Sequence, residues 1–164
     1  MRWFRATPPQ NGSTFSITTG RPTRLAIDPD DYHAAHVGLF DGGKQFFLTT
    51  PFVPALDGPG CEYVALYTFS VDGQFLQAKI DGLGPRADLD RAAAKRIHDQ
   101  RLSELGAIQI QRIEVEPFSI EEDGVVFGLI VREPEDPDDE WAVEVQPGDY
   151  MAFFEPWDGG VYDT

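Results

Sequence analysis

The sequence predicts an α+β fold: a twisted, mainly antiparallel sheet of about five to seven strands, with one long amphipathic helix and one short helix. Two observations predict it. Short β-rich segments are separated by Asp-Gly pairs, which suit tight turns with positive φ. Only one long segment has helical periodicity, so the alternation of strands and helices that makes a parallel sheet is missing. The six Asp-Gly pairs begin at Asp41, Asp57, Asp72, Asp81, Asp123 and Asp158.

Length and composition predict one folded domain spanning residues 1–164. The chain is 41% apolar and 12% aromatic, and a chain of this length can bury about 70% of its unfolded surface without a cofactor or disulfide. No apolar run follows the two N-terminal arginines, so neither a secretory signal nor a membrane anchor is expected. Cys61 is the single cysteine, and a cytoplasmic location is the simplest expectation.

Three hairpins are predicted from β-rich segments on either side of turn signals. The first joins strands at 62–69 and 74–80 through Asp72-Gly73. The second joins 108–116 to 125–132 through a longer connection that closes at Asp123-Gly124. The third begins at Trp141, alternates to Val145 and turns at Pro147-Gly148.

In the first strand of the second predicted hairpin, the apolar residues shift from even-numbered to odd-numbered positions along the strand. Ile108 and Ile110 share one face of an extended chain, whereas Ile113 and Val115 lie on the other parity. A regular strand would turn one of these pairs towards water, so we expect a bulge at residues 111–112.

Two helices are expected. The long one covers residues 88–106, with Asp88 as N-cap, Gly106 as the stop, and an apolar stripe at Leu89, Ala93, Ile97, Leu102 and Leu105. Including Arg86 it carries five cations. The short one covers residues 28–38, because Asp28 can cap it, Pro29 suits its first position and Gly38 can end it.

Charge is divided unevenly along the chain. Residues 1–113 contain 12 of the 13 Lys and Arg and 12 of the 28 Asp and Glu, so they are formally neutral. Residues 114–164 contain the other 16 acids and only one cation, Arg132, so the entire net charge of −15 belongs to them. Such a region repels nucleic acid and anionic membranes and attracts cationic partners. We therefore expect neither nucleic acid nor a membrane as partner.

The stretch EPEDPDDEW, residues 133–141, concentrates this charge. It lacks the glycine and the distal glutamate of an EF-hand calcium loop. It remains open whether it is a solvated edge loop that prevents aggregation or a surface that a basic protein recognises. In the second interpretation six acids steer the partner: Glu133, Glu135, Asp136, Asp138, Asp139 and Glu140.

Aromatic residues near the acidic stretch and at the C-terminus are the predicted anchors of that interface. Trp141, Trp157 and Tyr162 combine large rings with acidic neighbours, a composition typical of interfaces. The alternative is that the C-terminal segment folds back and closes the core.

Other chemistry is weakly supported. His33 and His36 would share one face of the expected short helix and could form part of a zinc or iron site, but no third ligand is identifiable. Cys61 precedes an acid, which disfavours a reactive thiolate. Neither a phosphate-binding glycine loop nor a GxSxG nucleophile elbow is present.

The sequence therefore favours a small acidic, non-enzymatic protein that binds a basic protein partner through its C-terminal half, in the manner of an immunity or inhibitor protein. No catalytic residue, metal ligand or cofactor is assigned. One alternative is a metal-dependent enzyme or metal-binding module that uses His33 and His36. The other is a small-ligand-binding domain with an aromatic-lined cavity.

Overall fold

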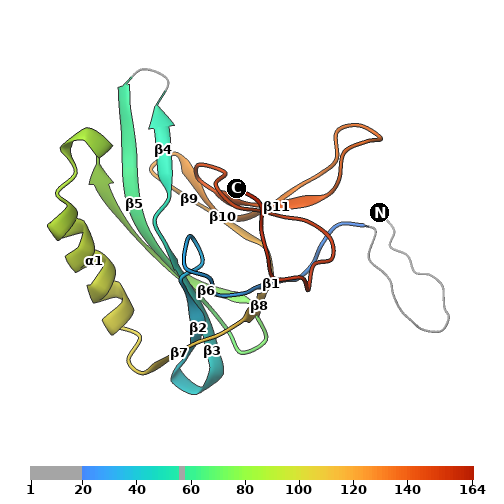
Figure 1. The fold of residues 1–164 in the computed structure, drawn as a ribbon, viewed down its shortest axis with the longest axis horizontal. Helices are drawn as coiled ribbons and strands as arrows, with labels where there is room; N and C mark the ends of the chain where they lie inside the picture. The colour runs from blue at the N-terminus through green and yellow to red at the C-terminus, as the bar shows by residue number, and fades with distance from the viewer. Residues whose placement is uncertain (1–19, 56–57) are drawn as a thin grey trace.

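The computed structural model describes residues 20–55 and 58–164 (Figure 1). These residues form twelve strands, one α-helix and two short 3-10 helices. No helix among them is both long enough and apolar enough to cross a membrane. In chain order the elements are β1 (Leu25–Ile27), β2 (His36–Phe40), η1 (Asp41–Gly43), β3 (Lys44–Thr49), β4 (Phe52–Ala55), β5 (Gly58–Phe69), β6 (Phe75–Gly84), η2 (Arg86–Asp88), α1 (Arg91–Ser103), β7 (Ile108–Ile110), β8 (Ile113–Val115), β9 (Phe118–Glu122), β10 (Val125–Arg132), β11 (Ala142–Gln146) and β12 (Ala152–Phe153).

The twelve strands form three antiparallel sheets, whereas the sequence predicted one sheet of about five to seven strands. The largest has the order β4-β5-β3-β2-β7, with β6 also paired to β5. A four-stranded sheet has the order β12-β11-β10-β9, and β1 pairs with β8 in a two-stranded sheet. The α+β class with mainly antiparallel strands is confirmed.

The first and third predicted hairpins are present. Strands β5 and β6 pair around the Asp72-Gly73 turn, with Phe69 opposite Phe75. Strands β11 and β12 pair beyond Pro147, with Val143 opposite Phe153.

The second predicted hairpin is wrong in its first arm. Strand β7 pairs with β2, whereas β8 pairs with β1, so the parity change at residues 111–112 marks a passage between two sheets and not a bulge. The hairpin partner of β10 is β9, with Glu122 opposite Val125 across the Asp123-Gly124 turn. Within this pair Gly128 has φ +144°, and a Cβ there would lie 2.2 Å from the Phe118 carbonyl oxygen, so this position requires glycine.

The large sheet lies between α1 on one side and the smaller sheets on the other (Figure 1). Because successive side chains alternate along β3 and β5, each strand places apolar residues on both faces of the large sheet. Phe46, Leu48, Val64 and Leu66 pack against Ile97, Leu102 and Leu105 around α1. Phe47, Ala65, Tyr67 and Phe69 face the main core, which also contains residues of β1, β8, β10, β11 and β12. One continuous core thus connects all three sheets.

The long helix forms, but it starts later than predicted. Its N-cap is Asp90, whose Oδ1 accepts a hydrogen bond from the Ala93 amide at 3.1 Å. Asp88 instead ends η2. Gly106, at φ +79°, follows the helix as predicted, and three members of the predicted stripe, Ile97, Leu102 and Leu105, contact the sheet.

The short helix predicted at residues 28–38 is wrong. Asp30 Oδ1 accepts hydrogen bonds from the amides of Tyr32 at 2.9 Å and Ala34 at 3.0 Å, which closes a turn. The chain then enters β2 at His36. The residues that favour a helix N-terminus also favour such Asx turns, and the burial of Val37 in the core selects the strand.

Candidate functional site

The acidic loop, residues 133–140, connects β10 to β11 and projects away from the body of the molecule on the side opposite α1 (Figure 1). Asp139 is half-buried. The other five predicted steering acids are exposed, namely Glu133, Glu135, Asp136, Asp138 and Glu140.

Asp139 organises this loop from within. Its Oδ2 lies 2.8 Å from Arg132 Nη1 and accepts a hydrogen bond from the Glu135 amide at 3.2 Å. Its Oδ1 accepts from the Glu140 amide at 2.9 Å. These backbone donors, together with Arg132, hold the pKa of Asp139 below its ordinary value. Asp139 therefore stays ionised and organises the loop, while its steering of a partner stays a prediction.

Arg132 also joins the loop to the sheet behind it. Its Nε lies 2.7 Å from Glu144 Oε2 on β11, so one guanidinium contacts both the loop and the strand that follows it. A second turn is closed where Asp136 Oδ1 accepts from the Asp138 amide at 3.0 Å. The exposed carboxylates therefore stand on a backbone with defined turns.

Ion pairs compensate some of the acids elsewhere in the described residues, but none of those on the outer part of the acidic loop. Arg101 bonds Asp81, Arg86 bonds Glu62 and Lys95 bonds Asp99. The cations on and before α1 are thus partly neutralised. In residues 20–55 and 58–164, no salt bridge involves the five exposed acids of the acidic loop.

The three predicted aromatic anchors lie in two different settings. Trp141 is half-buried at the end of the acidic loop, with the Arg21 guanidinium 6.0 Å from its ring centre. Trp157 and Tyr162 are half-buried against the main core. The Tyr162 hydroxyl donates to Asp30 Oδ2 and accepts from the His33 amide at 3.1 Å. Of the three, Trp141 directly follows the acidic loop in sequence, whereas Trp157 and Tyr162 belong to the C-terminal segment that packs on the core.

The C-terminal segment 155–164 lies along β1 and the turn that follows it. Carbonyl oxygens of Trp157 and Gly160 accept hydrogen bonds from the amides of Ala26 at 2.8 Å and Asp28 at 2.9 Å. Arg112 holds this segment in place, because its Nη1 donates to the Asp158 carbonyl at 2.8 Å. Sequence reasoning missed Arg112, since its partners are distant along the chain.

The two histidines of the predicted metal site point to different neighbours. The His33 ring centre lies 4.9 Å from that of Tyr150, and the His36 ring centre lies 4.7 Å from that of His98. Within the described ranges, no group of three or more His, Cys, Asp or Glu side chains is arranged to hold a metal ion. Cys61 is half-exposed, and its thiol donates to the neighbouring Glu62 carbonyl at 3.4 Å.

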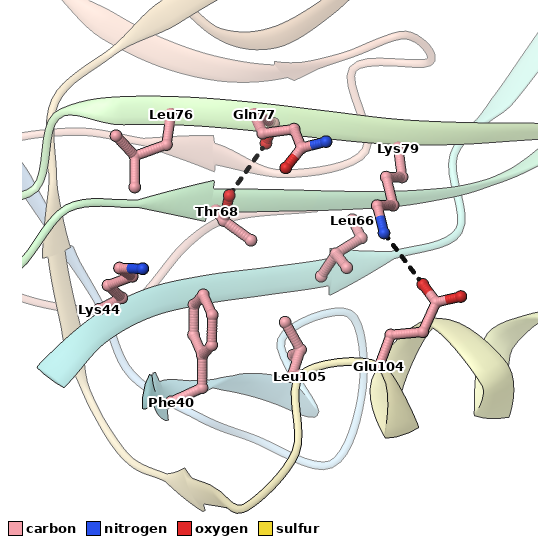
Figure 2. Close-up of a pocket in the computed structure, with 9 residues that line it drawn as sticks. All are labelled: Phe40, Lys44, Leu66, Thr68, Leu76, Gln77, Lys79, Glu104 and Leu105. Atoms are coloured by element: carbon pink, nitrogen blue, oxygen red, sulfur yellow. Dashed lines mark hydrogen bonds and ion pairs between the residues drawn. The ribbon is translucent and has the colours of Figure 1, made fainter. Parts of the chain in front are cut away.

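A shallow groove of about 210 Å³ opens beside the C-terminal end of α1 (Figure 2). Its apolar surface comes from Phe40, Leu66, Leu76 and Leu105. Two ammonium groups lie at its rim: Lys79, 3.2 Å from Glu104, and Lys44, 3.0 Å from Asp41. It is smaller than the roughly 300–1,000 Å³ of pockets that enclose drug-sized ligands, and Phe40 is its one aromatic residue.

Comparison of the chain with protein-family models, with curated proteins and with solved structures found no match. A function for this protein is therefore inferred from the geometry and charge of its surface.

Proposed function

We propose that this protein binds a basic protein partner through its acidic C-terminal half, in the manner of an immunity or inhibitor protein. One observation carries the proposal: five exposed carboxylates stand on a projecting loop, and no cation of the described residues forms a salt bridge with them. Like charges gathered without compensation create a local field that accelerates the approach of a cationic surface.

The hydrogen bonds and ion pairs inside the acidic loop favour a role in binding a partner over a role that only keeps the protein soluble. Arg132, Asp139 and Glu144 are joined by contacts of 2.7–2.8 Å. A loop that is ordered before binding loses less conformational entropy when the partner arrives. Trp141 adds a half-buried ring at the base of the loop, where an aromatic anchor suits an interface. Trp157 and Tyr162, which pack on the core, would contribute through their exposed edges.

The test compares two variants with the same change in net charge. In the loop variant, five acids become amides: Glu133→Gln, Glu135→Gln, Asp136→Asn, Asp138→Asn and Glu140→Gln. In the control variant, five exposed acids elsewhere in the same half become amides: Glu121→Gln, Glu122→Gln, Asp123→Asn, Glu155→Gln and Asp158→Asn. Asp139 is kept in both variants, so the loop retains its internal ion pair.

Immobilised wild-type protein is used to capture partners from lysate of the source cells, and a captured protein is then purified for stopped-flow association. We expect a basic protein that forms a stoichiometric complex, with an association rate constant that falls as salt rises and falls at least about tenfold in the loop variant. The control variant should retain most of the rate. Equal losses in the two variants, or no basic protein that forms a complex, would overturn the proposal.

The groove beside α1 supports a second candidate function, the binding of a small amphipathic anion. Leu76 is 52% exposed there, which leaves apolar surface open. The ammonium groups of Lys44 and Lys79 at the rim, each paired with one carboxylate, have three donors each and so retain donors for an anion. A thermal-shift series of short-chain carboxylates and the matching alcohols tests this. A carboxylate that raises the melting temperature of wild type, but not of Lys79→Gln, supports the candidate. Equal shifts in the two proteins contradict it.

A further inference from the structure

His36 and His98 form the closest histidine pair in the described part of the chain. His36 is the first residue of β2, His98 lies in the middle of α1, and their ring centres are 4.7 Å apart with planes at 71°. Both side chains are half-buried. The pair therefore connects α1 to the large sheet. No sequence pattern indicated this contact, because the two histidines are far apart along the chain.

The separation of the rings fits two ligands of one metal ion. With metal–nitrogen bonds of about 2.0–2.1 Å, the ion lies about 3.2 Å from each ring centre. Ligand–metal–ligand angles between about 90° and 109° then place the two ring centres about 4.5–5.2 Å apart. The observed 4.7 Å lies inside this interval.

A carboxylate beside His98 supports the same arrangement. His98 Nδ1 lies 3.5 Å from Asp99 Oδ1, and Asp99 is itself bonded by Lys95. A carboxylate that faces one ring nitrogen favours a proton on that nitrogen and leaves the other nitrogen for a metal. Nε2 of His98 is thus left as the ligand atom.

We propose that His36 and His98 bind one divalent transition-metal ion of the zinc or nickel type, with water completing its coordination. Two protein ligands make the ion exchangeable, and imidazole suits these metals. The bound ion would connect α1 to β2. This link would stabilise the attachment of α1 to the sheet, where none of the residues of α1 is fully buried.

The test uses tag-free protein, zinc chloride alone as the probe, and three single variants. Isothermal titration gives affinity and stoichiometry, and thermal unfolding with and without zinc gives the effect on the native state. His98→Gln removes the ligand on the helix. His36→Gln removes the ligand on β2. His33→Gln is the matched control, since it removes a histidine that contacts Tyr150 and not His98.

We expect wild type and His33→Gln to bind one zinc ion and to become more stable, with the folding equilibrium constant raised about 100-fold when free zinc is 100 times its dissociation constant. Both His36→Gln and His98→Gln should lose this effect while still folding without metal. Zinc binding that survives in His98→Gln would overturn the proposal, and so would loss of binding in His33→Gln. Absence of stoichiometric binding in wild type would overturn it as well.

Discussion

Arg132 and Asp139 form an ion pair, Nη1 to Oδ2 at 2.8 Å, at the base of the acidic loop. The same Asp139 carboxylate accepts hydrogen bonds from two loop amides, those of Glu135 and Glu140. One acid of the loop thus organises the backbone that presents the other five. This division of roles separates the stability of the loop from its charge, so the two can be tested independently.

Replacing Asp139 with Asn should loosen the acidic loop. The ion pair to Arg132 is lost and the acceptors of two amides are weakened, so we expect faster hydrogen exchange at the amides of Glu135 and Glu140. Asp138→Asn is the control, because in the described residues its side chain accepts no hydrogen bond. Unchanged exchange in Asp139→Asn would contradict the role assigned to this carboxylate.

The stability contributed by Asp139 should also depend on pH. Its folded-state pKa is lowered, mainly by the Glu140 and Glu135 amides. The contribution of Asp139 to stability is therefore present above its unfolded-state pKa of about 3.9. It disappears as the pH falls through the lower folded-state pKa.

Replacing Arg112 with Ala should destabilise the attachment of the C-terminal segment. Arg112 bonds Asp28 through Nε at 2.7 Å and Nη2 at 3.1 Å, and it also donates to the Asp158 carbonyl. Because the ion pair is more than a third exposed and solvent screens it, we expect a loss of only about 1 kcal/mol in the free energy of unfolding. Urea denaturation measures this value.

Arg112→Lys should recover little of that loss, because an ammonium cannot reproduce the planar fork of a guanidinium. Arg91→Ala on α1 is the matched control, since Arg91 forms no ion pair with other described residues. If Arg91→Ala costs as much as Arg112→Ala, the bonds of Arg112 do not stabilise the C-terminal segment.

Replacing Tyr67 with Phe should stabilise the protein. The Tyr67 hydroxyl is buried in the main core and has no hydrogen-bond partner among the described residues. Removal of an unpaired buried hydroxyl should raise the free energy of unfolding by about 1 kcal/mol. In Tyr150→Phe the opposite change is expected, since the Tyr150 hydroxyl bonds Thr49 Oγ1 at 2.6 Å. A loss of stability in Tyr67→Phe would show that the hydroxyl has a partner.

His33 should make stability fall in mild acid. Burial lowers the pKa of His33, and the nearby Asp30 carboxylate opposes part of this effect; the other titratable side chains that contact it are Tyr32, Tyr150 and Tyr162. The unfolded chain binds a proton near pH 6.5, so folding free energy is lost as pH falls below that value and the loss levels off below the folded pKa. Urea denaturation at pH 8 and pH 5.5 should show a smaller loss for His33→Gln than for wild type. Equal losses would contradict the assignment.

Sequence reasoning worked where local signals and tertiary contacts agree. The Asp72-Gly73 turn and its flanking β-rich segments predicted the β5–β6 hairpin, because hairpin register depends on neighbouring residues. The long helix was predicted for the same reason. The helix is shorter than the predicted 88–106, and its cap moved from Asp88 to Asp90, because two acids close together offered similar local signals.

Sequence reasoning failed where distant contacts decide the structure. The residues of segment 28–38 that resemble a helix start form an Asx turn at Asp30, since Val37 is buried in a strand. The parity change at residues 111–112 was visible, but no local pattern could tell a bulge from a change of sheet. The acidic loop was found by composition, whereas the His36–His98 contact and the bonds of Arg112 required the folded chain.

Whether the acidic loop recognises the partner is decided by the association rate constant of the purified basic partner. This rate constant is measured for the wild type, the loop variant and the control variant over a range of salt concentrations. We predict a rate constant at least about tenfold lower for the loop variant at low salt, a difference that shrinks as salt rises, and a small change for the control variant. Equal rates for the loop variant and the wild type at low salt would contradict the claim that the acidic loop recognises the partner.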